Sequence, residues 1–216
     1  MESSQQTVSS YYRYALYLSI FTIVYNIIEG LVSTYFGSAD ESLTLFGFGI
    51  DSFIETISGI GIFAMVVRIS QNPDSSKSPF EINALKITGW SFYILSAGLI
   101  VSAILSVIGG EQPKSTLLGI IIAVLSILCM VALIHYKRVV GEKLNSKAIV
   151  ADAQCNLVCI YMSITLLISS FLFEAFSIPY IDAAGALGLV YFSVNEGREC
   201  FEKARSMDDD CHCDTD

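Results

Sequence analysis

The feature that most constrains the fold is a run of 20 residues, Thr116–His135 (TLLGIIIAVLSILCMVALIH), with almost no polar side chain. A helix of about 20 apolar residues spans the hydrocarbon core of a bilayer. Because 53% of the 216 residues are hydrophobic and only 15% are charged, a soluble fold would lack the polar surface to cover such segments. The sequence therefore predicts an integral membrane protein that crosses the bilayer several times.

Apolar runs divide the chain into six predicted transmembrane helices. They cover residues 12–36, 43–69, 83–109, 115–138, 147–173 and 180–201, and the last is short and carries Asp182 at its start. Proline breaks helices, and the four prolines of the sequence lie between these runs. We therefore predict an all-α polytopic bundle over residues 12–205, with an N-terminal tail (1–11) and an acidic Cys/His C-terminal tail (206–216).

The basic residues predict the orientation of the bundle. Of the 12 Lys and Arg residues, all but Lys114 fall on the side that holds both predicted tails. Because Lys and Arg concentrate in cytoplasmic loops, we expect both termini in the cytosol. The N-terminal segment lacks the pattern of a cleaved signal, so we expect it to be retained. We expect the membrane to be the cytoplasmic membrane of a bacterium.

Composition also excludes two classes of protein. The net charge of −9 argues against nucleic-acid binding, which needs basic patches. Three of the six cysteines (Cys129, Cys155 and Cys159) fall inside apolar runs, and the others are predicted to face the cytosol. The sequence therefore predicts no extracellular disulfide framework.

Two carboxylates lie inside the second apolar run, at Asp51 and Glu55 in GFGIDSFIETISG. Residues four apart share a helix face and lie about 6 Å apart along the axis. A charge in hydrocarbon costs at least ~2.5–3.5 kcal/mol, and two like charges repel. A metal cation or a proton held between the carboxylates explains the pair. The alternative is an interhelical polar contact in which the carboxyl groups are protonated, or paired with Asn26 or a serine.

The fifth apolar run repeats this spacing with two thiols, Cys155 and Cys159, and Asp152 lies on the same face nearer the cytosol. A single buried cysteine is often a small hydrophobe, which is our interpretation of Cys129. A disulfide needs Cβ atoms about 3.8 Å apart, and neighbours on one helix face lie further apart. Two thiols on one face instead suit two ligands that converge on one ion.

The two pairs are predicted to lie at overlapping depths. The second helix runs inward from the outer face, and the fifth runs outward from the cytosol with the same rise of about 1.5 Å per residue. Packed together, Asp51, Glu55, Cys155 and Cys159 would form a tetrahedron of two oxygens and two sulfurs, which zinc-like ions accept. Asp152 would then belong to the cytosolic approach to the site.

Two weaker candidates lie outside these pairs. Glu29, in the first helix, is expected near the depth of Asp51, as a fifth ligand, a proton carrier or a structural partner. In the C-terminal tail, Cys211, His212 and Cys213 follow three aspartates. This tail would suit collection of soft metal ions at the cytosolic mouth, although acidic tails are usually only solvated.

These residues resemble the cation diffusion facilitator (cation efflux) family. SLTLFGFGIDSFIETISG resembles the second helix of that family, with Asp51 and Glu55 at its DxxxD positions. SKAIVADAQCNLVCIYMS resembles the fifth helix, and IPYIDAAGALGLVYFSVNEG the sixth. The resemblance covers nearly all of residues 12–205. It implies a six-helix transport domain with a tetrahedral metal site between helices two and five, transport from the cytosol outward, and a homodimer.

The sequence departs from the family pattern in several ways. The common HxxxD of helix five is replaced by Cys155 and Cys159, which puts the usual zinc specificity in question. The histidine-rich loop of many zinc carriers is absent, and the second connection lacks the histidines of the family's loop site, leaving Asp74. The segment after helix six is too short for the family's cytosolic domain, which indicates the short branch of the family and a dimer held by transmembrane helices.

Electrostatics predicts the mechanism. Four ionised ligands in a low dielectric would be prohibitive, so protons should occupy the site when the metal leaves. Metal binding needs ionised ligands and therefore expels protons. We expect proton-coupled efflux, by alternating access, of a divalent transition or heavy metal such as Zn²⁺, Cd²⁺ or a softer ion, with no tightly bound cofactor and no enzymatic activity. The alternatives are a non-transporting metal-binding or sensor protein, and an intramembrane thiol oxidoreductase that uses Cys155 and Cys159.

Overall fold

A computed structural model of the protein describes residues 2–71, 79–110, 112–113, 116–144, 147–178 and 180–213. Within these ranges, the side chains of residues 2–9, 58, 69–70, 79–81, 84, 147–152, 154–155 and 207–213 are not described. Asp74 of the second connection lies outside the described residues.

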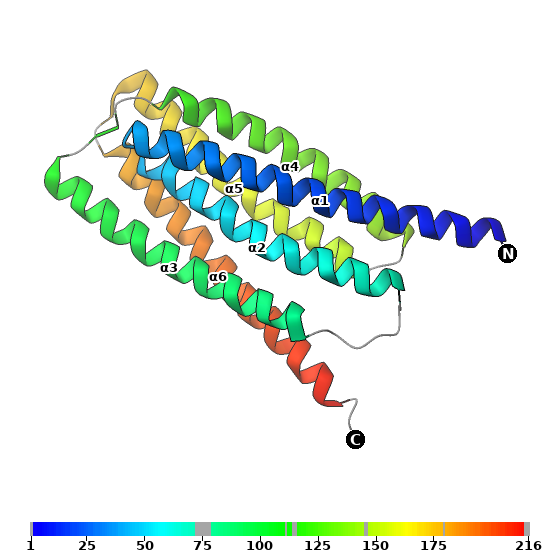
Figure 1. Cartoon of the computed structure of the whole chain (residues 1–216). Helices are drawn as coiled ribbons and strands as arrows, with labels where there is room; N and C mark the ends of the chain where they lie inside the picture. The colour runs from blue at the N-terminus through cyan, green and yellow to red at the C-terminus, as the bar shows by residue number, and fades with distance from the viewer. Residues whose placement is uncertain are drawn as a thin grey trace.

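The described chain forms six α-helices (Figure 1). They are α1 (Glu2–Ala39), α2 (Leu43–Gln71), α3 (Pro79–Gly109), α4 (Leu117–Lys143), α5 (Lys147–Phe176) and α6 (Ile181–Cys213). Successive helices run in opposite directions, so the two chain ends lie at the same end of the bundle. The prediction of an all-α bundle of six helices is confirmed.

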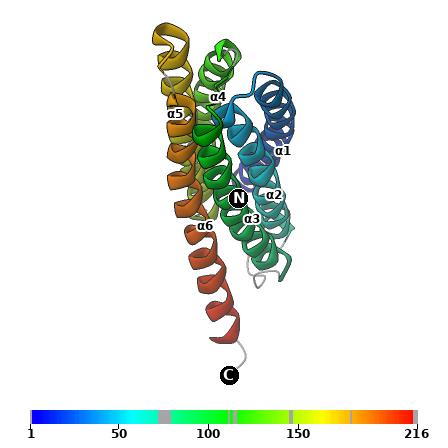
Figure 2. The same ribbon diagram turned by 90° about the vertical axis from the view of Figure 1, so that its left-hand side faces the viewer.

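Two helices extend well beyond the predicted runs. α1 begins at Glu2 rather than at residue 12, and α6 continues to Cys213 rather than ending at 201. Figure 2 shows the C-terminal half of α6 projecting past the neighbouring helices. Hydropathy detects only the apolar part of a helix, and the added segments at the start of α1 and the end of α6 are largely polar. Pro79, which we placed between helices, is instead the first residue of α3, where its missing N–H has no intrahelical partner to lose.

The outer surface of the bundle is apolar. Side chains such as Ile94 (70% exposed), Ile108 (77%) and Leu128 (64%) point away from the core. Exposed apolar surface of this kind marks contact with a membrane or a partner. Among the described residues, five helices contain stretches long and apolar enough to cross a bilayer: Ser10–Ala39, Leu43–Arg68, Leu85–Gly109, Leu117–Lys143 and Asn156–Phe176. α6 packs along α3 and against α5 and α2 as the sixth member of this multi-pass membrane bundle.

The helices associate most closely in three pairs, α1 with α2, α3 with α6, and α4 with α5. The first pair is tight because glycines let the two backbones meet. A Cβ atom on Gly49 would lie 2.5 Å from the backbone nitrogen of Thr34, and one on Gly37 would lie 2.4 Å from that of Phe46. Small residues at such contacts are typical of helix packing in membranes. This packing fixes the register between α1 and α2.

Asp182 joins the beginnings of α6 and α2. Its carboxylate accepts hydrogen bonds from the Ser42 hydroxyl (2.8 Å) and the Leu43 backbone N–H (2.6 Å). The Thr44 hydroxyl donates to the Asp182 carbonyl oxygen at 2.6 Å. A carboxylate at a helix N-terminus satisfies N–H groups that have no partner within the helix and favourably opposes the helix dipole. Asp182 therefore fixes the end of the bundle that lies opposite the two chain ends.

We expect Asp182→Ala to destabilise the protein by about 1–3 kcal/mol, because the buried donors at the start of α2 lose their acceptor. The measurement is the melting temperature of the purified protein in detergent. The control is Glu202→Ala, which removes an exposed partner of Arg198 and should have little effect because surface ion pairs contribute little. Equal melting temperatures for the two variants would contradict the capping role.

Candidate metal site

Asp51 lies on the inner face of α2 and is 2% exposed. Its Oδ1 atom has no hydrogen-bond partner among the described residues. Leaving a carboxylate oxygen buried without a donor is costly, and buried polar atoms are otherwise almost always paired. This oxygen is therefore a candidate ligand for a cation.

Glu55, one turn further into the membrane, meets α5. The Cys159 thiol donates a hydrogen bond to Glu55 Oε1. Cys159 is 6% exposed and packs in a cluster with Met130 and Leu133 of α4. The second carboxylate of the α2 pair and the second thiol of the α5 pair thus lie at the same depth, as the rise per residue predicts.

The other proposed ligand from α5 is described only in its backbone. Cys155 lies within α5, one turn before Cys159, and its side chain and that of Asp152 lie outside the described residues. The side chains of Cys211, His212 and Cys213 lie outside them as well. Among the side chains that are described, no three of the types His, Cys, Asp and Glu are gathered as a formed metal site. The roles of these residues stay predictions.

Glu29 of α1 is anchored beside the α2 pair. Its Oε1 accepts a hydrogen bond from the Tyr25 hydroxyl at 2.7 Å, and its Oε2 accepts one from the Ser52 hydroxyl at 3.1 Å. Both oxygens are therefore engaged by hydroxyl groups. Of the three roles expected for Glu29, these contacts favour that of a structural partner.

Sequence reasoning missed Glu196 of α6. Glu196 is 8% exposed and close enough to Asp51, Glu55 and Cys159 to interact with them electrostatically. A signal was present, because Leu189, Ser193, Glu196 and Cys200 recur every three or four residues and all are buried. The spacing places Glu196 on the inner face of α6, continuous with apolar positions.

Lys137 of α4 also has a role that the sequence did not indicate. In the sequence it is one of the 11 basic residues on the side of both predicted tails, yet it is 2% exposed. Its Nζ donates a hydrogen bond to Asn156 Oδ1 of α5 at 3.4 Å, and it interacts electrostatically with Glu55. A lysine near the end of a transmembrane helix ordinarily extends toward water, so the sequence gives no signal of its burial.

The charges around the α2 pair do not balance. Largely buried carboxyl groups from three helices (Glu29, Asp51, Glu55 and Glu196) lie within electrostatic range of one another. Among the described residues, one buried ammonium group, that of Lys137, lies near them. Since unpaired buried charge is costly in a membrane, this region requires protons or a bound cation.

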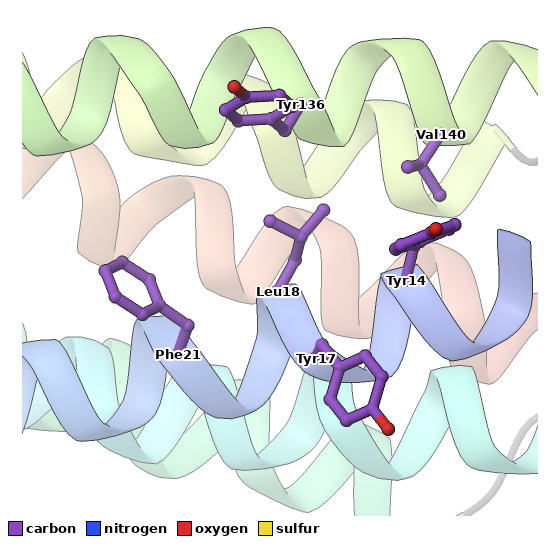
Figure 3. Close-up of a pocket in the computed structure, with 6 residues that line it drawn as sticks. All are labelled: Tyr14, Tyr17, Leu18, Phe21, Tyr136 and Val140. Carbon is purple, nitrogen blue, oxygen red and sulfur yellow. The ribbon is translucent and has the colours of Figure 1, made fainter.

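An apolar groove lies on the outside of the bundle, between α1 and α4 (Figure 3). Its volume is about 540 Å³, and it is lined by Tyr14, Tyr17, Leu18, Phe21, Tyr136 and Val140. None of these residues is an acid, a thiol or an imidazole, so the groove is separate from the candidate metal site. Its apolar lining suits contact with lipid.

Comparison with known proteins gives the family. Residues 16–207 match the cation efflux transmembrane domain. The chain belongs to the cation efflux family. This confirms the family inferred from the two ligand pairs, and it makes the protein a member of a family of transporters rather than of enzymes.

Two relatives of this cation efflux protein have curated names. It is 29% identical over 174 residues to an uncharacterised transporter of Methanocaldococcus jannaschii, a match that covers 78% of this chain and 60% of the relative. It is also 29% identical over 142 residues to the manganese efflux system protein MneP of Bacillus subtilis strain 168, which covers 63% of this chain and 47% of MneP. The chain thus spans less than two thirds of the length of either relative.

Proposed function

We propose that the protein exports a divalent transition or heavy-metal cation from the cytosol in exchange for protons, across a bacterial cytoplasmic membrane. Asp51, Glu55, Cys155 and Cys159 bind the ion. The observation that carries the proposal is the contact between Glu55 of α2 and Cys159 of α5, inside a cation efflux domain. The homodimer implied by the resemblance is part of the proposal and rests on contacts between transmembrane helices.

The contact supports coupling to protons. The hydrogen bond from Cys159 to Glu55 requires a protonated thiol. A metal ion that binds both groups needs the thiolate and the carboxylate, so the shared proton must leave as the metal arrives. The same two atoms thus hold either a proton or a metal ion, as an exchanger requires.

The helix arrangement supports alternating access. α2 packs mainly on α1, and α5 packs mainly on α4, whereas α2 and α5 touch over a short stretch that includes the Glu55–Cys159 contact. The two pairs also meet where α1 packs on α4, but both of these contacts are less extensive than those within each pair. Such pairs can move as units relative to one another. Such a movement opens the site to either side of the membrane while its ligands stay on their own helices.

The ligand types define the class of ion. Thiolates favour softer ions such as Zn²⁺, Cd²⁺ and Hg²⁺ over Mg²⁺ and Ca²⁺, and mixed oxygen and sulfur ligands in a tetrahedron suit Zn²⁺. The name of MneP assigns manganese to that relative. We therefore place Zn²⁺ and Cd²⁺ first as cargo and include Mn²⁺ in the test.

The test is a transport assay with the purified protein in vesicles that contain a pH-sensitive dye. We expect Zn²⁺ and Cd²⁺ to drive proton movement in the opposite direction, and Mg²⁺ and Ca²⁺ to drive none. The panel adds Mn²⁺, Co²⁺, Fe²⁺, Hg²⁺ and Pb²⁺, with protein-free vesicles as the control. Stoichiometric metal binding without flux would favour the sensor alternative, and a trapped Cys155–Cys159 disulfide would favour the oxidoreductase.

A further inference from the structure

Asn26 of α1 has a buried amide that the proposed site does not use. The side chain is 1% exposed, and Oδ1 has no hydrogen-bond partner among the described residues. A buried acceptor left without a donor costs about 1–3 kcal/mol. We considered Asn26 as a partner of the α2 carboxylates, yet the described hydrogen bonds join Glu29 and Cys159 to α2 instead.

The register between α1 and α2 places Asn26 at the level of Glu55 and Thr56. On one side of Asn26, Glu29 accepts the hydrogen bond from Ser52. On the other side, a Cβ atom on Gly59 would lie 3.2 Å from the Ile23 side chain. Asn26 is midway between Glu29 and Ile23 in α1. On α2, the midpoint between their partners Ser52 and Gly59 falls at Glu55 and Thr56.

A second observation places the same turn of α1 at the depth of Cys159. Tyr25, the residue before Asn26, packs against the cluster formed by Met130, Leu133 and Cys159. Asn26 itself lies on the buried face of α1, between Thr22 and Glu29. The turn that carries Asn26 therefore lies level with both Glu55 and Cys159, while Asp51 lies one turn further out on α2.

The geometry points to Asn26 Oδ1 as a further ligand of the transported ion, which extends the site to cations of higher coordination number such as Mn²⁺. This inference rests on the proposed function and concerns the same site. Two buried oxygens have no donor among the described residues, Asn26 Oδ1 of α1 and Asp51 Oδ1 of α2, and these two helices pack closely against each other. An amide oxygen is a hard, uncharged donor, so it adds a ligand without adding charge to an already acidic region.

The extra oxygen has different consequences for different ions. Zn²⁺ is usually bound by four ligands, and thiolates bind Cd²⁺ strongly. We therefore expect the transport of these two ions to depend little on Asn26. Mn²⁺ prefers oxygen ligands and an octahedral shell, so it depends on every oxygen that the site supplies. Asn26 thus determines how far the selectivity of the site extends toward hard ions.

The test compares Mn²⁺ and Cd²⁺ transport by the full chain in vesicles. Asn26→Leu keeps the volume but removes the oxygen, and Asn26→Asp keeps an oxygen ligand. The matched control is Ser33→Ala, which removes another buried oxygen of α1, two turns away, that has no partner among the described residues. We expect Asn26→Leu to lose Mn²⁺ transport by roughly ten- to hundredfold while Cd²⁺ transport changes far less. Asn26→Asp should retain Mn²⁺ transport, and Ser33→Ala should resemble the unmodified protein.

Retained Cd²⁺ transport in the same preparation shows that Asn26→Leu folds. An equal loss of both ions, or no loss of either, would overturn the assignment of Asn26. An unmodified protein that carries Cd²⁺ but not Mn²⁺ would also overturn it and leave the proposed function standing. A folded protein that carries neither ion would overturn the proposed function, and this inference with it.

Discussion

Asp51→Ala or Cys159→Ser is expected to abolish metal-dependent proton movement in vesicles while the protein stays folded. Each substitution removes one of four proposed ligands. Removing a group that only hydrogen-bonds to a metal ligand lowers affinity or activity by roughly ten- to hundredfold, so the loss of transport should be larger in both cases. Asp51→Ala also removes a buried charge whose Oδ1 has no donor among the described residues, so folding should not suffer. The measurement is the initial rate of dye response after metal addition, with elution from a size-exclusion column as the test of folding.

Cys129→Ser is the matched control for Cys159→Ser. Cys129 of α4 packs against the same cluster as Cys159, so the two substitutions place a hydroxyl in similar apolar surroundings. Only Cys159 touches an α2 carboxylate by a described hydrogen bond. We expect Cys129→Ser to transport at a rate close to that of the unmodified protein. Full transport by the double variant Asp51→Ala, Cys159→Ser would refute the site.

The number and order of the helices could be predicted because a membrane imposes a minimum length of apolar sequence. The helix ends could not be predicted from the same signal. α6 runs to Cys213 through residues that are largely polar, and hydropathy does not detect them. Asp182 stood out in the sequence, but its capping of α2 depends on a contact between residues far apart in the chain.

The site could be predicted in part because spacing defines helix faces. The four-residue intervals placed each pair on one face, and the rise per residue placed the two pairs at a common depth. The Glu55–Cys159 contact agrees with that geometry. Glu196 was not predicted because it lies near the polar end of the predicted sixth helix, and its burial depends on how α6 packs against the other helices. The burial of Lys137 could not be predicted because it depends on the neighbouring helix α5, whose Asn156 accepts a hydrogen bond from the lysine.

Replacing both thiols by the ligands common in the family, Cys155→His with Cys159→Asp, is expected to retain transport and to change its selectivity. Imidazole and carboxylate are harder ligands than thiolate, so the preference should move from Cd²⁺ and Hg²⁺ toward Zn²⁺. We expect the ratio of Cd²⁺ to Zn²⁺ transport to fall by roughly tenfold or more, about 1.4 kcal/mol per factor of ten. The number of ligands is unchanged, so a tetrahedral ion still fits.

The same double substitution separates ligand chemistry from packing. An aspartate at position 159 would face Glu55 in a buried setting, so two carboxyl groups would share the place that a thiol and a carboxyl group now hold. Like charges so close are tolerated only with a cation or a proton between them, and the variant should therefore depend on bound metal for its stability. Its melting temperature should rise with added Zn²⁺ more than that of the unmodified protein. An unchanged ratio of Cd²⁺ to Zn²⁺ transport would instead mean that the α5 thiols do not touch the ion, and that the selectivity lies with α1 and α2.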